Sequence, residues 1–281
     1  MNIRITSDST CDLGELVTKH DIGIMALQVH LDAQSYRDGV DITPQDIFDF
    51  VAKTKILPKT SAPSIGEYEE FFEEQLKGND FVIHFNISAK SSGSHNFAVE
   101  ASKSFKGKVR VIDSKALSSG QGLLVMHAVD MRDEGKSVDE IEDSVNEMKN
   151  RINTSFVPDS LDYLFKGGRC SRMQLYGANL LKIHPKIVMT DGQLTQGGRY
   201  RGDMTKCIER YISDLCAQYP NYDKTRCFVT HSTADRELVE MAKAKVKELF
   251  AFDEVIETVA GSIVTSHCGR NTLGVLFVYN P

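Results

Sequence analysis

The chain has 281 residues, of which 41% are hydrophobic and 26% are charged, the balance of an ordinary globular protein. At this length we expect about two domains, each able to bury its own core. The net charge is −6 and charges of both signs are interspersed. Composition therefore gives no electrostatic basis for nucleic-acid binding, because such proteins carry a basic patch or stripe.

The sequence shows no targeting or membrane segment. The N-terminus enters a strand pattern directly, without the charged, apolar and small-residue regions of a signal peptide. No apolar run approaches the roughly 20 residues of a membrane span. The six cysteines are scattered and form no Cys-x-x-Cys pair. We therefore expect free, buried thiols and a cytoplasmic protein.

In the first half of the chain, strand and helix patterns alternate. Strands are predicted over 2–6, 22–31, 81–85 and 109–112. Helices are predicted over 12–20 and 44–54, then one that starts at Ser64 and another that follows the segment 86–94 and ends at about 105. Two later helices follow, the second starting at Ser137. Thr43-Pro44 and the capping boxes Ser64/Glu67 and Ser137/Glu140 mark three of the helix starts. This alternation predicts an α/β domain over residues 1–151, with a mostly parallel sheet flanked by helices.

The second half reads as an α+β domain with a mixed sheet, over residues 152–281. Strands are predicted over 153–157, 184–190, 193–200, 227–231, 254–259 and 273–279, and helices over 159–166, 172–182, 203–218 and 235–250. Asp191-Gly192 is a hairpin signal between two of these strands, and Gly167-Gly168 ends a helix. Because no long linker separates the two domains, we expect them to pack closely.

Two hydroxyl-rich segments, 59–64 and 86–94, each lead into the start of a predicted helix. A helix start carries unpaired backbone N–H groups and a partial positive charge, so it favours a carboxylate or phosphate. Serine and threonine hydroxyls add donors, and Gly93 would let the backbone approach closely. Neither segment has the Gly-x-x-x-x-Gly-Lys-Ser/Thr pattern of a nucleotide P-loop. Together they predict one anion site, with simple helix capping as the alternative.

Polar loops follow three predicted strands, and ligands of open α/β sheets collect beyond the carboxyl ends of the strands. These loops are 7–10, which contains Asp8 and Ser9, then 88–94, and 113–115. Further candidates are Arg169 after two glycines, Arg201 at a strand end, and His267 in a polar loop before the last strand, where it could donate a proton to a carboxylate. Each also has a structural interpretation: Asp8 and Ser9 as helix caps, the arginines as solvated side chains and His267 as a core histidine.

The sequence offers little support for catalysis or metal binding. The histidines show no metal-ligand spacing, and a His-x-x-x-His pair is absent. A Gly-x-Ser-x-Gly nucleophile motif is also missing, although Ser92, His267 and Asp8 could be combined into a triad on paper. We expect no metal, no cofactor and no catalytic residue. A small-molecule hydrolase or transferase and a pure interaction module stay as alternative functions.

Several segments, taken in order, resemble the DegV family of bacterial proteins over essentially the whole chain. They are Asp8-Ser9-Thr10, Thr60-Ser61-Ala62-Pro63-Ser64, Ser88-Ala89-Lys90-Ser91-Ser92-Gly93-Ser94, Ile112-Asp113-Ser114, Leu161-Asp162-Tyr163-Leu164 with Gly167-Gly168-Arg169, and His267-x-Gly269. Two places depart from the family pattern: Cys268-Gly269-Arg270-Asn271 replaces a more usual Gly-Pro-Gly run, and Ser91 stands where leucine is common.

The resemblance implies a two-domain protein that binds one long-chain fatty acid, such as palmitate, stearate or oleate, between its domains. It also implies that the acyl carboxylate is presented to a separate fatty acid kinase, in phospholipid metabolism. By this resemblance Thr60 and Ser92 hold the carboxylate, and the acyl tail enters the second domain. The other ligand-binding candidates are Ser61, Arg201 and His267, with Asp8, Ser9, Ser88, Gly93 and Arg169 in support. We expect a monomer.

Overall fold

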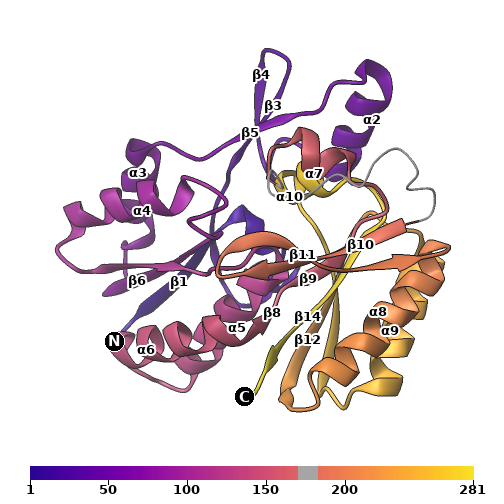
Figure 1. Ribbon diagram of the computed structural model, residues 1–281. Coiled ribbons are helices and arrows are strands. Elements are labelled where there is room, and N and C mark those ends of the chain that lie inside the picture. Colours follow the sequence, from indigo (N-terminus) through magenta and orange to yellow (C-terminus); the bar gives the residue numbers. More distant parts are fainter. Residues whose placement is uncertain (170–182) are drawn as a thin grey trace.

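The computed structural model describes residues 1–169 and 183–281 (Figure 1), so the helix predicted over 172–182 lies outside the described residues. The first half of the chain builds a four-stranded sheet in the order β2-β1-β6-β7. Its strands are Gly23–Met25, Ile3–Asp8, Phe81–Asn86 and Val109–Asp113, and every pairing is parallel. This confirms the predicted parallel sheet.

Helices cover both faces of this parallel sheet. Because successive side chains of a strand point to opposite faces, Val82 packs with the helices α3 (Ile65–Gln75) and α4 (Ser94–Ser102), whereas Ile83 faces α5 (Ser119–Asp133) and α6 (Val138–Met148). The capping boxes predicted at Ser64 and Ser137 both form. The fold class predicted for this half is confirmed.

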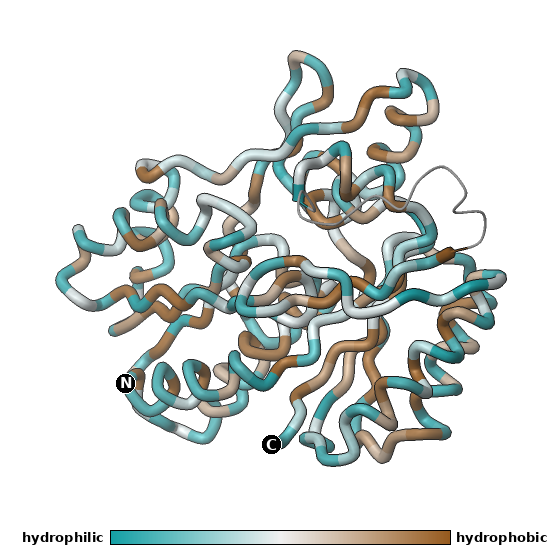
Figure 2. The backbone as a smooth tube through the Cα atoms, viewed as in Figure 1, coloured by the Kyte–Doolittle hydropathy of each residue, from teal (hydrophilic) through white to brown (hydrophobic). Residues whose placement is uncertain are grey.

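The second half builds a seven-stranded mixed sheet in the order β11-β10-β9-β14-β12-β13, with β8 beside β14. The strands are β8 Ile152–Asn153, β9 Ser155–Val157, β10 Ile183–Thr190, β11 Gln193–Arg201, β12 Tyr222–Ser232, β13 Glu254–Val259 and β14 Thr272–Tyr279. Helices α8 (Met204–Gln218) and α9 (Arg236–Leu249) pack on one face (Figure 1). Figure 2 shows hydrophobic residues along β14, whereas hydrophobic and hydrophilic residues alternate along α8 and α9.

Helix α5 joins the two halves. It is buried around most of its circumference, and one apolar cluster combines its side chains with Ile5 and Phe85 of the parallel sheet and with Phe228 and Leu276 of the mixed sheet. A helix buried on all sides belongs to the interior of a protein rather than to one face. The two halves therefore pack closely, as the missing linker predicted.

A third, three-stranded sheet was not predicted. It has the order β4-β3-β5, formed by Gln34–Arg37, Gln28–Leu31 and Lys59–Ser61. The single strand predicted over 22–31 was therefore wrong: it divides into β2 and β3, which lie in different sheets. Between them the backbone N–H of Leu27 donates to Ser9 Oγ at 3.2 Å. The helix predicted over 12–20 shortens to α1 (Leu16–Lys19), because Asp12 and Gly14 adopt positive φ.

Helix α10 (Ser262–Cys268) replaces the polar loop predicted before the last strand. No side chain of its own sequence caps its start. Instead, buried carboxylates from the first half accept its first N–H groups: Asp12 Oδ1 from Gly261 at 2.8 Å and Asp38 Oδ1 from Ser262 at 2.7 Å. Acceptors at a helix start stabilise it by pairing N–H groups that have no partner within the helix. The helix packs against β3, β5, α2 (Pro44–Thr54) and α7 (Asp162–Lys166), where the two halves meet.

Candidate functional site

A largely apolar pocket lies between the two halves of the chain. Its empty space is about 620 Å³, the opening to solvent included. The apolar lining is Leu27, Ala62, Ile87, Leu117, Leu164, Leu194, Ile263, Val264 and Cys268, and the polar lining is Thr60, Ser61, Ser91, Ser92, Arg169 and His267. Such a combination suits a ligand with a long apolar part and one polar end.

One contact that joins the two halves at this pocket is between Thr60 and His267. Thr60 lies on β5 and His267 on α10, and Thr60 Oγ1 is 2.9 Å from His267 Nε2. Ser61, the next residue on β5, also lines the pocket, and its hydroxyl is 2.8 Å from His30 Nε2 of β3. The unpredicted three-stranded sheet therefore holds the Thr60 hydroxyl against α10.

The His267 ring is neutral near neutral pH. Burial, and next to it the positive charge of Arg169, lower the pKa of His267 to about 4. Its Nδ1 is buried and has no hydrogen-bond partner among the described residues. Gly167 gives this nitrogen room, since a Cβ at Gly167 would lie 2.6 Å from Nδ1 and 2.8 Å from the Tyr163 carbonyl oxygen. The glycine after α7 thus fixes where the imidazole can lie.

The second hydroxyl-rich segment forms a tight turn before α4. The Ser88 carbonyl oxygen accepts hydrogen bonds from the N–H groups of Ser91 and Ser92, and Ser92 Oγ accepts one from Ser94 N at 3.2 Å. Ser92 is therefore both a cap and a pocket residue, so the two alternatives drawn from the sequence apply together. Gly93 has φ −72°, which any residue adopts, and does not line the pocket. The backbone conformation at position 93 therefore does not itself require a glycine.

Asp8 supports this segment from beneath. Its buried carboxylate accepts hydrogen bonds from Thr10 Oγ1 at 2.6 Å, Gln121 Nε2 at 2.9 Å and Ile87 N at 2.8 Å. Burial raises the pKa of Asp8, and these hydrogen bonds oppose the increase. Asp8 thus caps the short turn after β1 and ties it to the segment after β6, without lining the pocket.

The three predicted polar loops do meet. Asp113 Oδ1, after β7, accepts the N–H of Ala89 at 3.1 Å, and Ser88 N donates to the Ala116 carbonyl at 2.9 Å. Ser88 Oγ reaches further, donating at 2.7 Å to the carbonyl of Gly192 in the β10–β11 turn. Ser88 and Asp8 thus position the loops rather than face the pocket.

Of the predicted ligand-binding residues, the structure brings Thr60, Ser61, Ser92 and His267 to one pocket, together with Arg169. Arg201 is exposed at the end of β11 and is absent from the pocket lining. Sequence reasoning missed the apolar wall. Val264 lies three residues before His267 on α10, so it shares a helix face with it, but that signal becomes visible only once α10 is recognised as a helix.

Residues 1–169 and 183–281 contain neither a candidate metal site nor a membrane-spanning helix. In these ranges no group of three or more His, Cys, Asp and Glu side chains could hold a metal ion. Within the same part of the chain, no helix is long and apolar enough to cross a membrane. The cysteines in these ranges are free thiols, and Cys170 lies outside them.

The fold and site define a class: a two-domain α/β protein with an apolar, hydroxyl-bearing pocket between a parallel sheet and a mixed sheet. A profile of the DegV family matches residues 2–280. A DegV domain-containing protein of Caldanaerobacter subterraneus subsp. tengcongensis is 34% identical over 277 residues, 98% of each chain. The chain therefore belongs to the DegV family, which confirms the resemblance seen in the sequence.

Solved structures agree with this assignment. A DegV family protein of Thermus thermophilus, which binds fatty acid, superposes with a TM-score of 0.92. It is 29% identical to this chain, and the match covers 100% of both chains. A stearic acid-binding protein of Eubacterium ventriosum superposes with a TM-score of 0.85 at 28% identity, covering 99% of this chain and 98% of the other. These relatives confirm the predicted two-domain fold.

Proposed function

We propose that this protein binds one long-chain fatty acid in the pocket between its two halves. The observation that carries the proposal is the pairing of an apolar pocket with a cluster of hydroxyls and a neutral imidazole, from Thr60, Ser92 and His267. An apolar tail drives binding by leaving water, whereas its carboxylate must find hydrogen bonds to avoid a large desolvation cost. The relatives described as fatty acid-binding proteins support the same ligand class.

The fatty acid carboxylate would be held by hydrogen-bond donors rather than by a buried counter-ion. If the neutral His267 carries its proton on Nε2, it donates to Thr60 Oγ1, and the threonine hydroxyl keeps its own proton for the carboxylate. Ser92 Oγ already accepts a bond from Ser94 N, so its proton is likewise available to the ligand. Hydrogen bonds to a charged group contribute about 1.5–3 kcal/mol each.

The acyl tail would extend toward the mixed sheet. A second hollow shares Leu117, Val264 and Cys268 with the first and continues along Phe156, Ala260 and Leu276, among other residues, with empty space of about 340 Å³. Each buried methylene contributes about 0.8 kcal/mol, so a C16 chain offers on the order of 12 kcal/mol before ordering costs. This burial energy is large enough to drive binding of a chain the size of palmitate, stearate or oleate.

We further infer that the protein acts as a carrier that presents the carboxylate to a separate fatty acid kinase, and not as an enzyme. His267 Nε2 is engaged by Thr60, so the ring is not placed as a base for Ser92, as a hydrolase would need. Any phosphoryl transfer would then be the partner's chemistry. Free thiols fit a reducing cytoplasm, and we propose that the carrier is monomeric.

The proposal is tested by a double variant, Thr60→Val with Ser92→Ala, against Thr60→Ser with Ser92→Thr, which retains both hydroxyls. Loss of two hydrogen bonds to a charged group predicts at least about a hundredfold weaker palmitate binding by titration calorimetry. Circular dichroism and thermal melting establish that each variant is folded. Undiminished stoichiometric binding in the folded Val/Ala variant would refute the assignment of the carboxylate site.

A further inference from the structure

A third hollow, lined largely by polar residues and called the polar hollow below, lies on the other face of β10. Alternate residues of β10 point to opposite faces: Ile187 packs with Leu164 and Val264 beside the apolar pocket, whereas Lys186 and Val188 line the polar hollow. Its empty space is about 1,140 Å³, the part open to solvent included. Strand β10 therefore separates the polar hollow from the apolar pocket.

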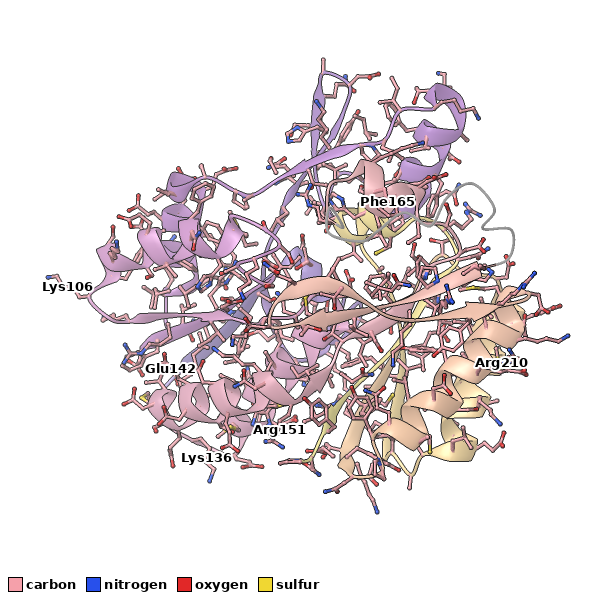
Figure 3. All side chains as sticks on the ribbon, viewed as in Figure 1. Lys106, Lys136, Glu142, Arg151, Phe165 and Arg210 are labelled. Carbon is pink, nitrogen blue, oxygen red and sulfur yellow. The ribbon has the colours of Figure 1, made fainter. Side chains whose placement is uncertain are left out.

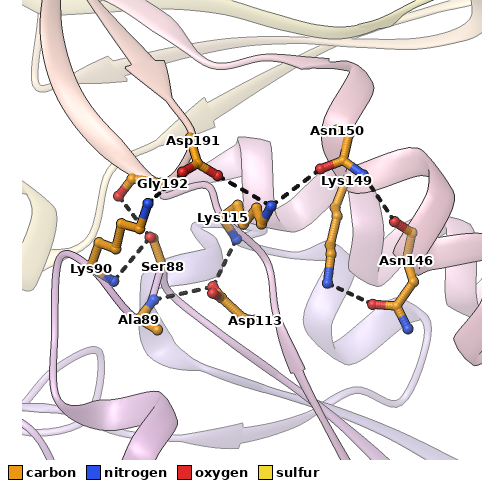
Figure 4. A network of polar contacts seen from close by, with 10 residues as sticks. All are labelled: Ser88, Ala89, Lys90, Asp113, Lys115, Asn146, Lys149, Asn150, Asp191 and Gly192. Carbon is orange, nitrogen blue, oxygen red and sulfur yellow. Dashed lines mark hydrogen bonds and ion pairs between the residues drawn. The ribbon is translucent and has the colours of Figure 1, made fainter.

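The charged lining of this polar hollow is mostly positive. Its charged residues, within the described ranges, are Lys115, Lys149, Lys186 and one carboxylate, Asp191. Asp191 is shared, lying 2.5 Å from Lys90 Nζ and 3.2 Å from Lys115 Nζ (Figure 4). One carboxylate between two ammonium groups leaves the hollow with excess positive charge, in a chain whose net charge is −6.

Lys186 and Lys149 have neutral partners. Lys186 is only 5% exposed, and its Nζ donates to Gln218 Oε1 at 3.1 Å. Lys149 Nζ donates to Asn146 Oδ1 at 2.6 Å, beside Lys115 and Asn150 (Figure 4). Neither ammonium forms an ion pair with a carboxylate in the part of the chain that the structure describes. Burial lowers the pKa of both lysines. Lys149 is half-buried and feels the charges of Asp113 and Glu142, and Lys186 is buried and feels the charge of Asp214. A buried ammonium without a paired carboxylate, as at Lys186, favours an added anion.

We propose that this hollow binds a small phosphate-bearing molecule with at least two negative charges. Three lysines line it, with Lys115 and Lys149 close enough to interact electrostatically, and a lysine binds phosphate as a compact point charge. Neutral groups that can donate hydrogen bonds, Asn150, Thr190 and Tyr219, share the wall. The inference goes beyond the proposed function, because it concerns a different hollow and needs no acyl ligand.

The test uses inorganic pyrophosphate as the probe, in titration calorimetry of the full chain at about 0.15 M salt, where exposed charges are screened over about 8 Å. We expect saturable binding at one site. Lys149→Gln with Lys186→Gln should weaken it at least about tenfold. Lys136→Gln removes one unit charge from an exposed residue outside the hollow (Figure 3) and should leave the affinity unchanged.

A second measurement keeps the test decisive if the Lys149/Lys186 variant fails to fold. Limited lysine acetylation of the wild-type protein, read by peptide mass spectrometry, should show pyrophosphate protecting Lys115 and Lys149 but not Lys136. No saturable binding by the wild-type protein would overturn the proposal. Equal weakening by Lys136→Gln, or equal protection of Lys136, would also overturn it, since the attraction would then be non-specific.

Discussion

The neutral state of His267 predicts a pH-dependent stability. The pKa of His267 falls from 6.5 to about 4 on folding, mainly through burial. Because the folded pKa is the lower one, the unfolded chain binds the proton more readily between these values, so stability falls as pH decreases through this window. Each pKa unit corresponds to 1.36 kcal/mol. Between about pH 7 and pH 4.5 the wild-type protein should lose about 2 kcal/mol through this residue.

The assay is urea unfolding of the wild-type protein and His267→Gln at several pH values in this range. Other buried groups, such as His84, whose pKa burial lowers to about 3, titrate in both proteins, so they cancel in the difference. The wild-type stability relative to the variant should decline by about 2 kcal/mol as pH falls. A difference that stays constant across the range would refute a buried, neutral His267.

Two further changes probe the pocket. Gly167→Ala places a Cβ 2.6 Å from His267 Nδ1. We expect urea unfolding to show a loss of about 1–3 kcal/mol of stability and calorimetry to show weaker palmitate binding. An unchanged affinity would show that the position of the His267 ring does not matter for binding. Val264→Phe enlarges a side chain that lines both apolar hollows. At about 0.8 kcal/mol per lost methylene, it should shift preference toward shorter chains in competition between laurate and stearate, and an unchanged preference would mean that the tail takes another path.

Local patterns were sufficient for most of the fold. The parallel sheet follows from alternating apolar strands and capped helices, and the β10–β11 hairpin from Asp191-Gly192, where both residues adopt positive φ as this turn requires. The three-stranded sheet could not be predicted in this way. Its strands β3, β4 and β5 have only three or four residues each. β3 and β4 form a short local hairpin, but β5 joins the sheet by pairing with β3 from a distant part of the chain.

Prediction of the site from the sequence has the same limit. Thr60, Ser92 and His267 were identified because hydroxyls and imidazoles in polar segments suggest an anion site, and the structure places all three at one pocket. Helix α10 was missed because the groups that cap it, Asp12 and Asp38, lie far away in sequence. Arg201 was carried over by resemblance, and here it lies exposed on β11, outside the pocket lining. Which strand residues face a pocket depends on sheet pairing, which the sequence alone does not specify.

The proposed fatty acid ligand is tested most directly by native mass spectrometry of the protein purified from a bacterial host, followed by denaturation and identification of the released molecule. The proposal predicts a stoichiometric mass addition that resolves to a fatty acid of about 14–18 carbons. A protein that carries no lipid, and takes up neither added palmitate nor added oleate, would contradict it.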